Sequence, residues 1–220
     1  LPVPPGFTIT TDVCLSFFTN GNDWPEGLTE QLQASLQTLE QRTGKGFGSI
    51  NNPLLVSVRS GAPVSMPGMM DTILNLGLNP TTTEALAKQT GNRKFAYDAY
   101  RRFVKMFGDV VLGIHYARFS RAEETIRNGR RDDELTAEDY EAFAKAYREV
   151  IEAERYHLPD DPNEQLRLAI NAVFRSFNNP RARYHRKSQG IPDHTGTAVN
   201  IQAMVFGNMG EQSATGVCFT

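Results

Sequence analysis

The sequence contains little cysteine and no long apolar run, and these two absences limit what the protein can be. Cys14 and Cys218 are its only cysteines, which excludes a disulfide framework and a C-x-x-C metal motif. No apolar stretch approaches the roughly 20 residues that span a bilayer, and no secretory signal opens the chain. We therefore expect a protein of the reducing cytoplasm that has no membrane partner.

A strong excess of charge is also lacking. With a formal net charge of -2, the protein has no general attraction to nucleic acid or to an anionic membrane. Any site for an anion must then be a local cluster of donors. The apolar share of 40% in a chain of 220 residues is enough to build the core of a globular protein.

General motifs of phosphate binding and catalysis are absent. The chain has no G-x-x-x-x-G-K-[ST], and the glycine-rich stretch 44–48 falls short of G-x-G-x-x-G, so we interpret it as a helix stop. Ser60 and Ser65 do not lie in G-x-S-x-G, which argues against a serine hydrolase. The four histidines are scattered without the i, i+4 spacing of a helical metal site, and we predict no metal ligands among them.

The first third of the chain mixes strand and helix patterns. The patterns predict a strand at 7–10, helices over 11–18 and 27–43, and a buried strand at 54–58. The stretch 61–71 is rich in glycine, proline and methionine and has no period, so it is predicted to be a loop.

From about 81 to 188 the pattern is almost entirely helical. Apolar stripes predict helices over 93–110 and 137–154. The charged stretch 121–134 is predicted to be a solvated turn between helices. Helix starts are predicted at two capping boxes and at one Asp-Pro pair, namely Thr81 with Glu84, Ser120 with Glu123, and Asp161 with Pro162.

After Gly190 the period changes to that of a strand. Apolar residues alternate over 198–206 and predict a strand with Val199, Ile201, Ala203 and Val205 on one side. A turn at 207–210 and a returning strand at 215–219 would complete an antiparallel hairpin. The layout predicts an α+β fold with a mixed first part, a helical middle and a β end.

The segment after the buried strand offers the most informative chemistry. The strand delivers Arg59 to its end, where open sheets commonly bind ligands, and a guanidinium can bind phosphate oxygens in a bidentate fork. Gly61 and Gly68 permit backbone N–H groups to point at an anion, and the Thr72 hydroxyl adds a donor. On these grounds alone the alternative stays open that Arg59 caps a strand and that the loop only turns the chain.

A basic cluster lies near the end of the helical part. It could contact phosphate or a docking domain, or it could be a solvated helix face, and the sequence leaves these alternatives open. Its members are Arg181, Arg183, His185, Arg186 and Lys187.

The stretch 57–79 resembles the signature of pyruvate, phosphate dikinases. The similarity is strongest in Pro67-Gly68-Met69-Met70-Asp71-Thr72-Ile73-Leu74-Asn75-Leu76-Gly77. It continues through segments spread over essentially the whole chain, and a match of this length is highly specific. These segments are 91–98, 174–177, 179–182, 196–202, 210–211 and 215–217.

The resemblance implies an ATP-grasp-type nucleotide-binding domain. Residues 1–79 would be part of its first nucleotide-binding subdomain, 80–190 a helical subdomain, and 191–220 the start of a second nucleotide-binding β subdomain. In this family ATP phosphorylates a histidine on a separate swivelling domain, with inorganic phosphate as co-substrate. That domain then visits a barrel domain to interconvert pyruvate and phosphoenolpyruvate. The full-length enzyme is expected to be a homo-oligomer.

The resemblance also implies roles for single residues. Arg59 matches the family's phosphate-binding arginine, and we expect it to be catalytic as well as ATP-binding. Gly68 and Thr72 match ATP-contacting positions in the related synthases. Gln202 matches the strand that runs beside the adenine.

Some of the family's pattern is expected to lie outside this sequence. A Gly-Gly-Lys-Gly segment would precede Leu1, and the residues that hold Mg²⁺ would follow Thr220, so we expect the fragment alone to be inactive. One rival is a pyruvate-water dikinase, or phosphoenolpyruvate synthase, against which the string 66–72 argues. Another is a non-catalytic docking or regulatory module, which would have no need of the Arg59 loop.

Overall fold

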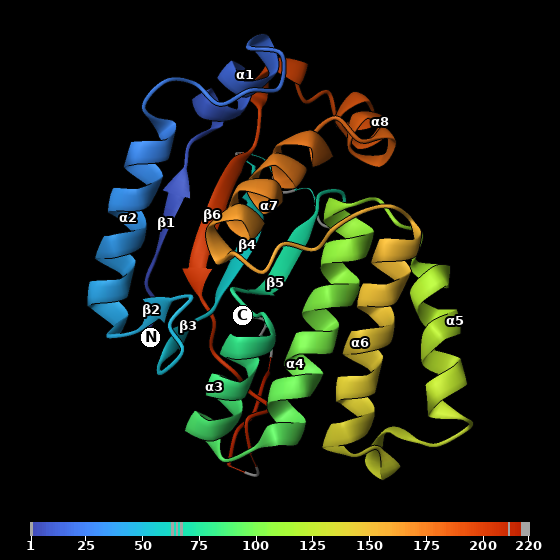
Figure 1. Ribbon diagram of the computed structural model, residues 1–220. Coiled ribbons are helices and arrows are strands. Elements are labelled where there is room, and N and C mark those ends of the chain that lie inside the picture. The colour runs from blue at the N-terminus through green and yellow to red at the C-terminus, as the bar shows by residue number, and fades with distance from the viewer. Residues whose placement is uncertain (1, 63, 65, 67, 211, 217–220) are drawn as a thin grey trace.

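The computed structural model of the chain describes residues 2–62, 64, 66, 68–210 and 212–216. It has an α+β fold, as predicted, in which helices pack around a four-stranded antiparallel sheet (Figure 1). None of the described helices is both long enough and apolar enough to cross a membrane.

The sheet is built from strands that come from both ends of the sequence. Its order is β1-β6-β4-β5, and each neighbouring pair is antiparallel. The last of these strands therefore lies inside the sheet, between β1 and β4. The strands are β1 (Gly6–Ile9), β4 (Val56–Gly61), β5 (Thr72–Leu76) and β6 (Ala198–Ala203), with a separate parallel pair of β2 (Gly46–Phe47) and β3 (Pro53–Leu54).

Alternating side chains give the sheet one apolar face and one polar face. Val58 of β4 lies opposite Ile73 of β5 and Ile201 of β6, and all three are completely buried. Helix α7 (Pro162–Ser176) crosses this apolar face and contacts all three strands (Figure 1). Arg59 and Asn200, each one residue away along its strand, belong to the opposite face.

Helices form most of the rest of the chain. α4, α5 and α6 lie side by side beyond β5 (Figure 1), with α6 packed between the other two. Besides α7, the helices are α1 (Thr11–Thr19), α2 (Leu28–Thr43), α3 (Pro80–Thr90), α4 (Arg93–Met106), α5 (Tyr116–Arg127), α6 (Ala137–Ala153) and α8 (Pro180–Gln189), with short π or 3-10 turns η1 (Phe107–Val111), η2 (Asp132–Glu134) and η3 (Asp193–Thr195).

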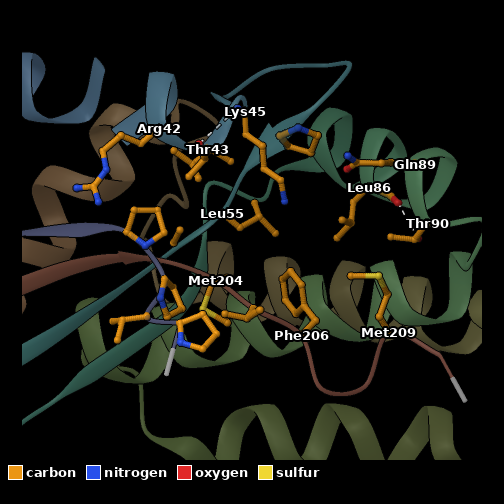
Figure 2. Close-up of a pocket in the computed structure, with 18 residues that line it drawn as sticks. Arg42, Thr43, Lys45, Leu55, Leu86, Gln89, Thr90, Met204, Phe206 and Met209 are labelled. Carbon is orange, nitrogen blue, oxygen red and sulfur yellow. Dashed lines mark hydrogen bonds between the residues drawn. The ribbon is translucent and has the colours of Figure 1, made fainter. Parts of the chain in front are cut away.

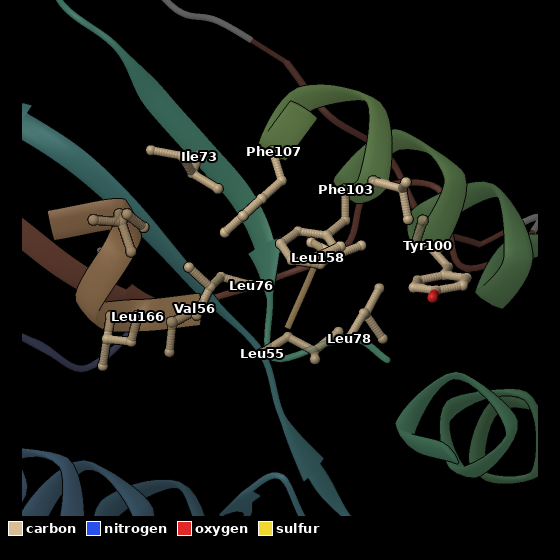
Figure 3. Packing of buried hydrophobic residues seen from close by; sticks show 14 of the residues in the cluster. Leu55, Val56, Ile73, Leu76, Leu78, Tyr100, Phe103, Phe107, Leu158 and Leu166 are labelled. Carbon is tan, nitrogen blue, oxygen red and sulfur yellow. The ribbon is translucent and has the colours of Figure 1, made fainter. Parts of the chain in front are cut away.

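The core joins the apolar sheet face to the helices. Figure 3 shows Ile73 and Leu76 of β5 beside Phe107 and Phe103, and all four side chains are completely buried. Burying a side chain of this size stabilises the fold by about 1.5–3 kcal/mol. The sheet is thus fixed from its apolar side, which gives the polar face a rigid support.

Two predicted helix starts are wrong. α3 begins at Pro80, and its cap is Asn79: the Thr82 N–H donates to Asn79 Oδ1 and the Asn79 N–H donates to Thr82 Oγ1, both at 2.8 Å. The predicted pair of Thr81 with Glu84 lies beyond that cap, inside the helix. Asn is a strong N-cap residue and Pro suits the first helical position, so this pair takes precedence over a later threonine.

The second wrong start affects the charged stretch 121–134. Ser120 and Glu123 lie inside α5, whose cap is His115. The stretch is α-helical through Arg127 and ends in the 3-10 turn η2, so only its second half is a turn between helices. The Asp161-Pro162 start, in contrast, is confirmed, because Asp161 caps α7 by accepting the Asn163 N–H.

The predicted C-terminal hairpin is not formed by the described residues. β6 ends at Ala203, and Val205, predicted to share one side of the strand with Val199 and Ile201, lies beyond it and is 71% exposed. Thr215 and Gly216 carry no strand, and the remainder of the predicted returning strand, 217–219, lies outside the described residues. β6 pairs with β1 on one side and with β4 on the other, so neither of its edges is free for a following strand.

Candidate functional site

A row of polar side chains crosses the polar face of the sheet. Thr8 of β1 lies opposite Asn200 of β6, Asn200 opposite Arg59 of β4, and Arg59 opposite Thr72 of β5. Residues directly opposite one another on antiparallel strands point to the same face with Cβ atoms about 4.5–5.5 Å apart. We call Thr8, Asn200, Arg59 and Thr72 the polar row.

Asn200 is fixed within the polar row by its neighbours. The Thr8 hydroxyl donates to Asn200 Oδ1 at 2.7 Å. A Cβ added to Gly61 would lie 2.6 Å from Asn200 Nδ2, so the glycine makes room for this amide. With its oxygen engaged by Thr8, Asn200 presents its NH₂ group on the side of β4.

Arg59 has the chemistry that the sequence predicts, in a slightly different place. It lies within β4, which continues to Gly61, rather than at the end of a strand. Its side chain is exposed, whereas Ser57 and Val58 before it are buried. The backbone of Arg59 is therefore held in the sheet while its guanidinium, which is always charged, remains accessible to an anion.

Gln202 lies on the same face as the polar row. In the ladder it is opposite Ser57 of β4 and Gly6 of β1. Its Nε2 group donates to the Pro4 carbonyl at 3.0 Å. Gln202 thus attaches the segment before β1 to the sheet, close to the point where β6 ends.

A cavity of about 790 Å³ opens beside the end of β6 (Figure 2). Figure 2 shows the Lys45 side chain reaching toward the space between Leu55, Leu86 and Phe206. Pro4, the residue that Gln202 binds, also lines the cavity. Its walls are mostly apolar, and two cationic residues, Arg42 and Lys45, are among those that line it. This arrangement suits a flat ring with polar edges.

The loop between β4 and β5 carries Gly68. This residue is exposed and has φ +70°, and a Cβ placed on it would meet no atom within 4 Å. The following residues are attached to helices: the Asn179 side chain donates to the Met69 carbonyl at 3.0 Å, and the Asp71 N–H donates to Ser176 Oγ at 3.3 Å. The described end of the loop is therefore fixed to the segment that joins α7 to α8.

The structure places three of the four predicted site residues, Arg59, Thr72 and Gln202, on one face of the sheet. Gly68 lies in the adjoining loop, and the binding roles of all four stay predictions. The sequence did not single out Thr8 or Asn200. The alternation over 198–203 puts Asn200 on the polar side of its strand, but no local signal shows that β6 pairs with β4.

The predicted basic cluster is divided by the structure. Arg186 is only 1% exposed and lies 3.9 Å from the centroid of the Phe177 ring. Its guanidinium also donates to Asp193 Oδ1 at 3.0 and 2.8 Å. Arg186 is therefore a structural residue that connects α8 to η3, while its neighbours Arg183 and Lys187 are exposed.

Acidic groups near the loop do not form a metal centre. Among the residues that the structure describes, no three His, Cys, Asp or Glu side chains come together where a metal ion could bind. Asp71 and Asp109 share a hollow with Arg181. Burial raises the pKa of the Asp71 carboxyl, and Arg181 acts against this change.

The chain is similar to a known family over nearly its whole length. Residues 20–220 match the family described as pyruvate phosphate dikinase, AMP/ATP-binding domain. The entire chain aligns with enzymes named pyruvate, phosphate dikinase: it is 54% identical to that of Giardia intestinalis and 51% identical to that of Rhizobium meliloti, and covers 25% of each. A chloroplastic relative from Arabidopsis thaliana is 48% identical, with 23% covered. The chain thus spans about a quarter of the length of these relatives.

Proposed function

The chain belongs to the pyruvate phosphate dikinase family of AMP/ATP-binding domains, and from this premise we propose that the polar row binds the phosphates of ATP. The observation that carries the proposal is the row itself, which sets Arg59 between Asn200 and Thr72 on one sheet face. A guanidinium can hold two phosphate oxygens at once. The amide of Asn200 and the hydroxyl of Thr72 add neutral donors on either side of it.

The residues of the polar row act by position and charge. Phosphoryl transfer requires little covalent chemistry from a protein, and most of its catalysis comes from orientation and electrostatic stabilisation. Arg59 neutralises charge on the phosphates, and its neighbours fix their orientation. Backbone N–H groups of the loop that carries Gly68 supply further donors, as in other anion-binding loops.

We further propose that the cavity beside the end of β6 holds the adenine ring. Ala203, which lines the cavity, lies opposite Val56, and Asn200 lies opposite Arg59 three residues along the same ladder. Three residues of strand correspond to about 10 Å, a span that a nucleoside triphosphate covers. Gln202 contributes indirectly in this arrangement, because it holds Pro4 at the cavity wall.

The activity of the whole protein follows as a wider proposal. The chain is the ATP-grasp-type part of a phosphotransferase in which ATP phosphorylates a histidine on a swivelling domain of the same full-length chain. Inorganic phosphate is the co-substrate of that step, and the phosphohistidine domain then visits a barrel domain, where pyruvate and phosphoenolpyruvate are interconverted. The names of the relatives support this proposal. Homo-oligomerisation and a cytoplasmic location stay predictions, and one relative named above is chloroplastic.

Magnesium enters the proposal only as the ion that accompanies ATP. The polar row contains no carboxylate, and the described part of the chain offers no cluster of ligands for a metal. The ligands of the ion would then come from other parts of the full-length protein. The residues described in the structure contribute to phosphate binding through Arg59 and through neutral donors.

Calorimetric titration with ATP and with adenosine tests the proposal. In the full-length protein, Arg59→Ala should weaken ATP binding by one to two orders of magnitude, because it removes a charge-assisted contact worth about 1.5–3 kcal/mol. Adenosine binding should stay the same, since the cavity is untouched. Arg121→Ala, which removes an exposed arginine of α5, is the matched control and should change neither affinity. Equal ATP affinity in both variants would contradict the proposal.

A further inference from the structure

Two side chains where α7 ends and α8 begins, Ser176 and Asn179, make hydrogen bonds to the loop that carries Gly68. The two helices could form without these bonds. We propose that Asn179 is a positioning residue that orients this loop for phosphate binding. The inference rests on the proposed function of the loop and adds a residue that lies outside the polar row. It is carried by the contacts that Asn179 and Ser176 make.

Asn179 uses both ends of its side-chain amide. Its Oδ1 atom accepts the Ala182 N–H at 2.7 Å and so caps α8. Its Nδ2 group donates to the Met69 carbonyl at 3.0 Å. Capping α8 needs only the oxygen, and serine or aspartate would serve equally well. The second contact, from the nitrogen, is the one that reaches the loop.

A second hydrogen bond, made by Ser176, attaches the loop to the end of α7. The Asp71 N–H donates to Ser176 Oγ at 3.3 Å, and the Ser176 hydroxyl donates to the Val173 carbonyl at 2.7 Å. Ser176 is buried, so its position is set by α7. The loop is therefore held at two points, two residues apart, by side chains from one rigid segment.

These contacts determine which backbone groups of the loop are left for a ligand. In a trans peptide the C=O and the following N–H point in opposite directions. Because the Met69 carbonyl is turned toward Asn179, the Met70 N–H is turned away from it. The Met69 N–H donates to the Met66 carbonyl at 3.2 Å, and that of Asp71 is bound to Ser176. Among the described residues, the N–H groups of Gly68 and Met70 have no such acceptor and are the ones we assign to phosphate.

The segment itself is rigid enough to position a loop. Arg186, buried in α8, donates to the Phe177 carbonyl and lies over the Phe177 ring. Phe177 is also buried. Together these contacts fix the backbone on which Ser176 and Asn179 are held.

The test separates the two ends of the Asn179 amide. In the full-length protein, Asn179→Ser keeps an oxygen that can cap α8 but loses the nitrogen that reaches Met69. Asn179→Ala loses both and serves as the control for helix capping. Ser176→Ala independently removes the second contact. Three quantities are measured for each: the melting temperature, the affinities for ATP and adenosine, and backbone hydrogen exchange over residues 68–71 without nucleotide.

We expect Asn179→Ser to melt close to the wild-type protein and Asn179→Ala to melt at a lower temperature. Both should speed exchange over 68–71 and weaken ATP binding about 2- to 12-fold, the factor that an ordinary hydrogen bond provides, with adenosine binding unchanged. Ser176→Ala should have the same effect on ATP.

If Asn179→Ser and Ser176→Ala bind ATP as the wild type does while Arg59→Ala does not, the inference is overturned and the proposed function stands. If ATP binding depends on neither Arg59 nor Asn179, the proposed function fails, whatever the exchange rates show. If Asn179→Ser melts as low as Asn179→Ala and exchange over 68–71 is unchanged, Asn179 has only a structural role and the inference is wrong.

Discussion

Gly68 has a positive φ, which residues with a side chain rarely adopt, although there is space around it for a side chain. Its φ of +70° is disfavoured for any residue with a Cβ, although no atom lies within 4 Å of that position. Gly21 shares both properties, with φ +70° and nothing within 4 Å. It lies between α1 and α2, outside the loop between β4 and β5. The two glycines therefore form a matched pair.

We predict that Gly68→Ala and Gly21→Ala lower the free energy of unfolding by a similar amount, about 1 kcal/mol, because both place an alanine at positive φ. Only Gly68→Ala should also weaken ATP binding in the full-length protein. Urea unfolding beside calorimetric titration measures both effects. If the two variants lose stability equally and bind ATP equally well, the Gly68 N–H does not contact phosphate.

At the scale of single residues, the sequence indicated which side chains could bind phosphate better than it indicated where side chains lie in the fold. Arg59 and Thr72 could be proposed from the sequence because residue type and the family resemblance both indicated them, whereas Gln202 was indicated by the resemblance alone. Thr8 and Asn200 could not, because their significance comes from a ladder that joins residues 192 positions apart. Arg186 was wrongly grouped with exposed cations, since nothing in the sequence shows that it is buried against Phe177.

At the scale of the elements, the start of α3 gives a direct test of the corrected cap. Asn79→Ala should lower the free energy of unfolding by about 1 kcal/mol, because it removes the acceptor for the Thr82 N–H. Thr81→Ala should change it little, since Thr81 is exposed within the first turn. Chemical denaturation of both variants checks this. Equal losses, or a larger loss for Thr81→Ala, would contradict the assignment of the cap.

β5 was not predicted from the sequence, because its side chains do not alternate regularly between buried and exposed. Its register with β4 shifts between Val56 and Val58, and Asn75 has φ +59°. Such a bulge interrupts strict alternation, so that Asn75 and Leu76, although adjacent, are both buried. In contrast, α2 and α6 keep their helical period throughout and were predicted within a few residues of their observed ends.

At the scale of the whole molecule, the position of β6 could not be predicted. Local signals correctly indicated a strand near 198–206, and a following turn made a hairpin the simplest interpretation. The structure instead inserts β6 between β1 and β4, which are more than 130 residues earlier in the sequence. A strand chooses its partners by the total burial that the fold achieves, which no short window of sequence contains.

The same non-local pairing assembles the proposed site. β4 supplies Arg59, β5 supplies Thr72, and only the arrival of β6 adds Asn200 and completes the polar row. The site therefore depends on the assembled four-stranded sheet rather than on one sequence motif. It follows that Arg59 should act on the step that uses ATP and leave chemistry on other domains unaffected.

Single-turnover kinetics of the full-length protein test this most directly, by following each half-reaction separately in Arg59→Ala. Phosphorylation of the acceptor histidine by ATP and phosphate should slow by about 10²–10³-fold, the loss expected when one preorganised electrostatic contact is removed. Phosphoryl exchange between that histidine and pyruvate should remain near the wild-type rate. Equal slowing of both half-reactions, or an unchanged rate with ATP, would contradict the assignment of the polar row to the phosphates of ATP.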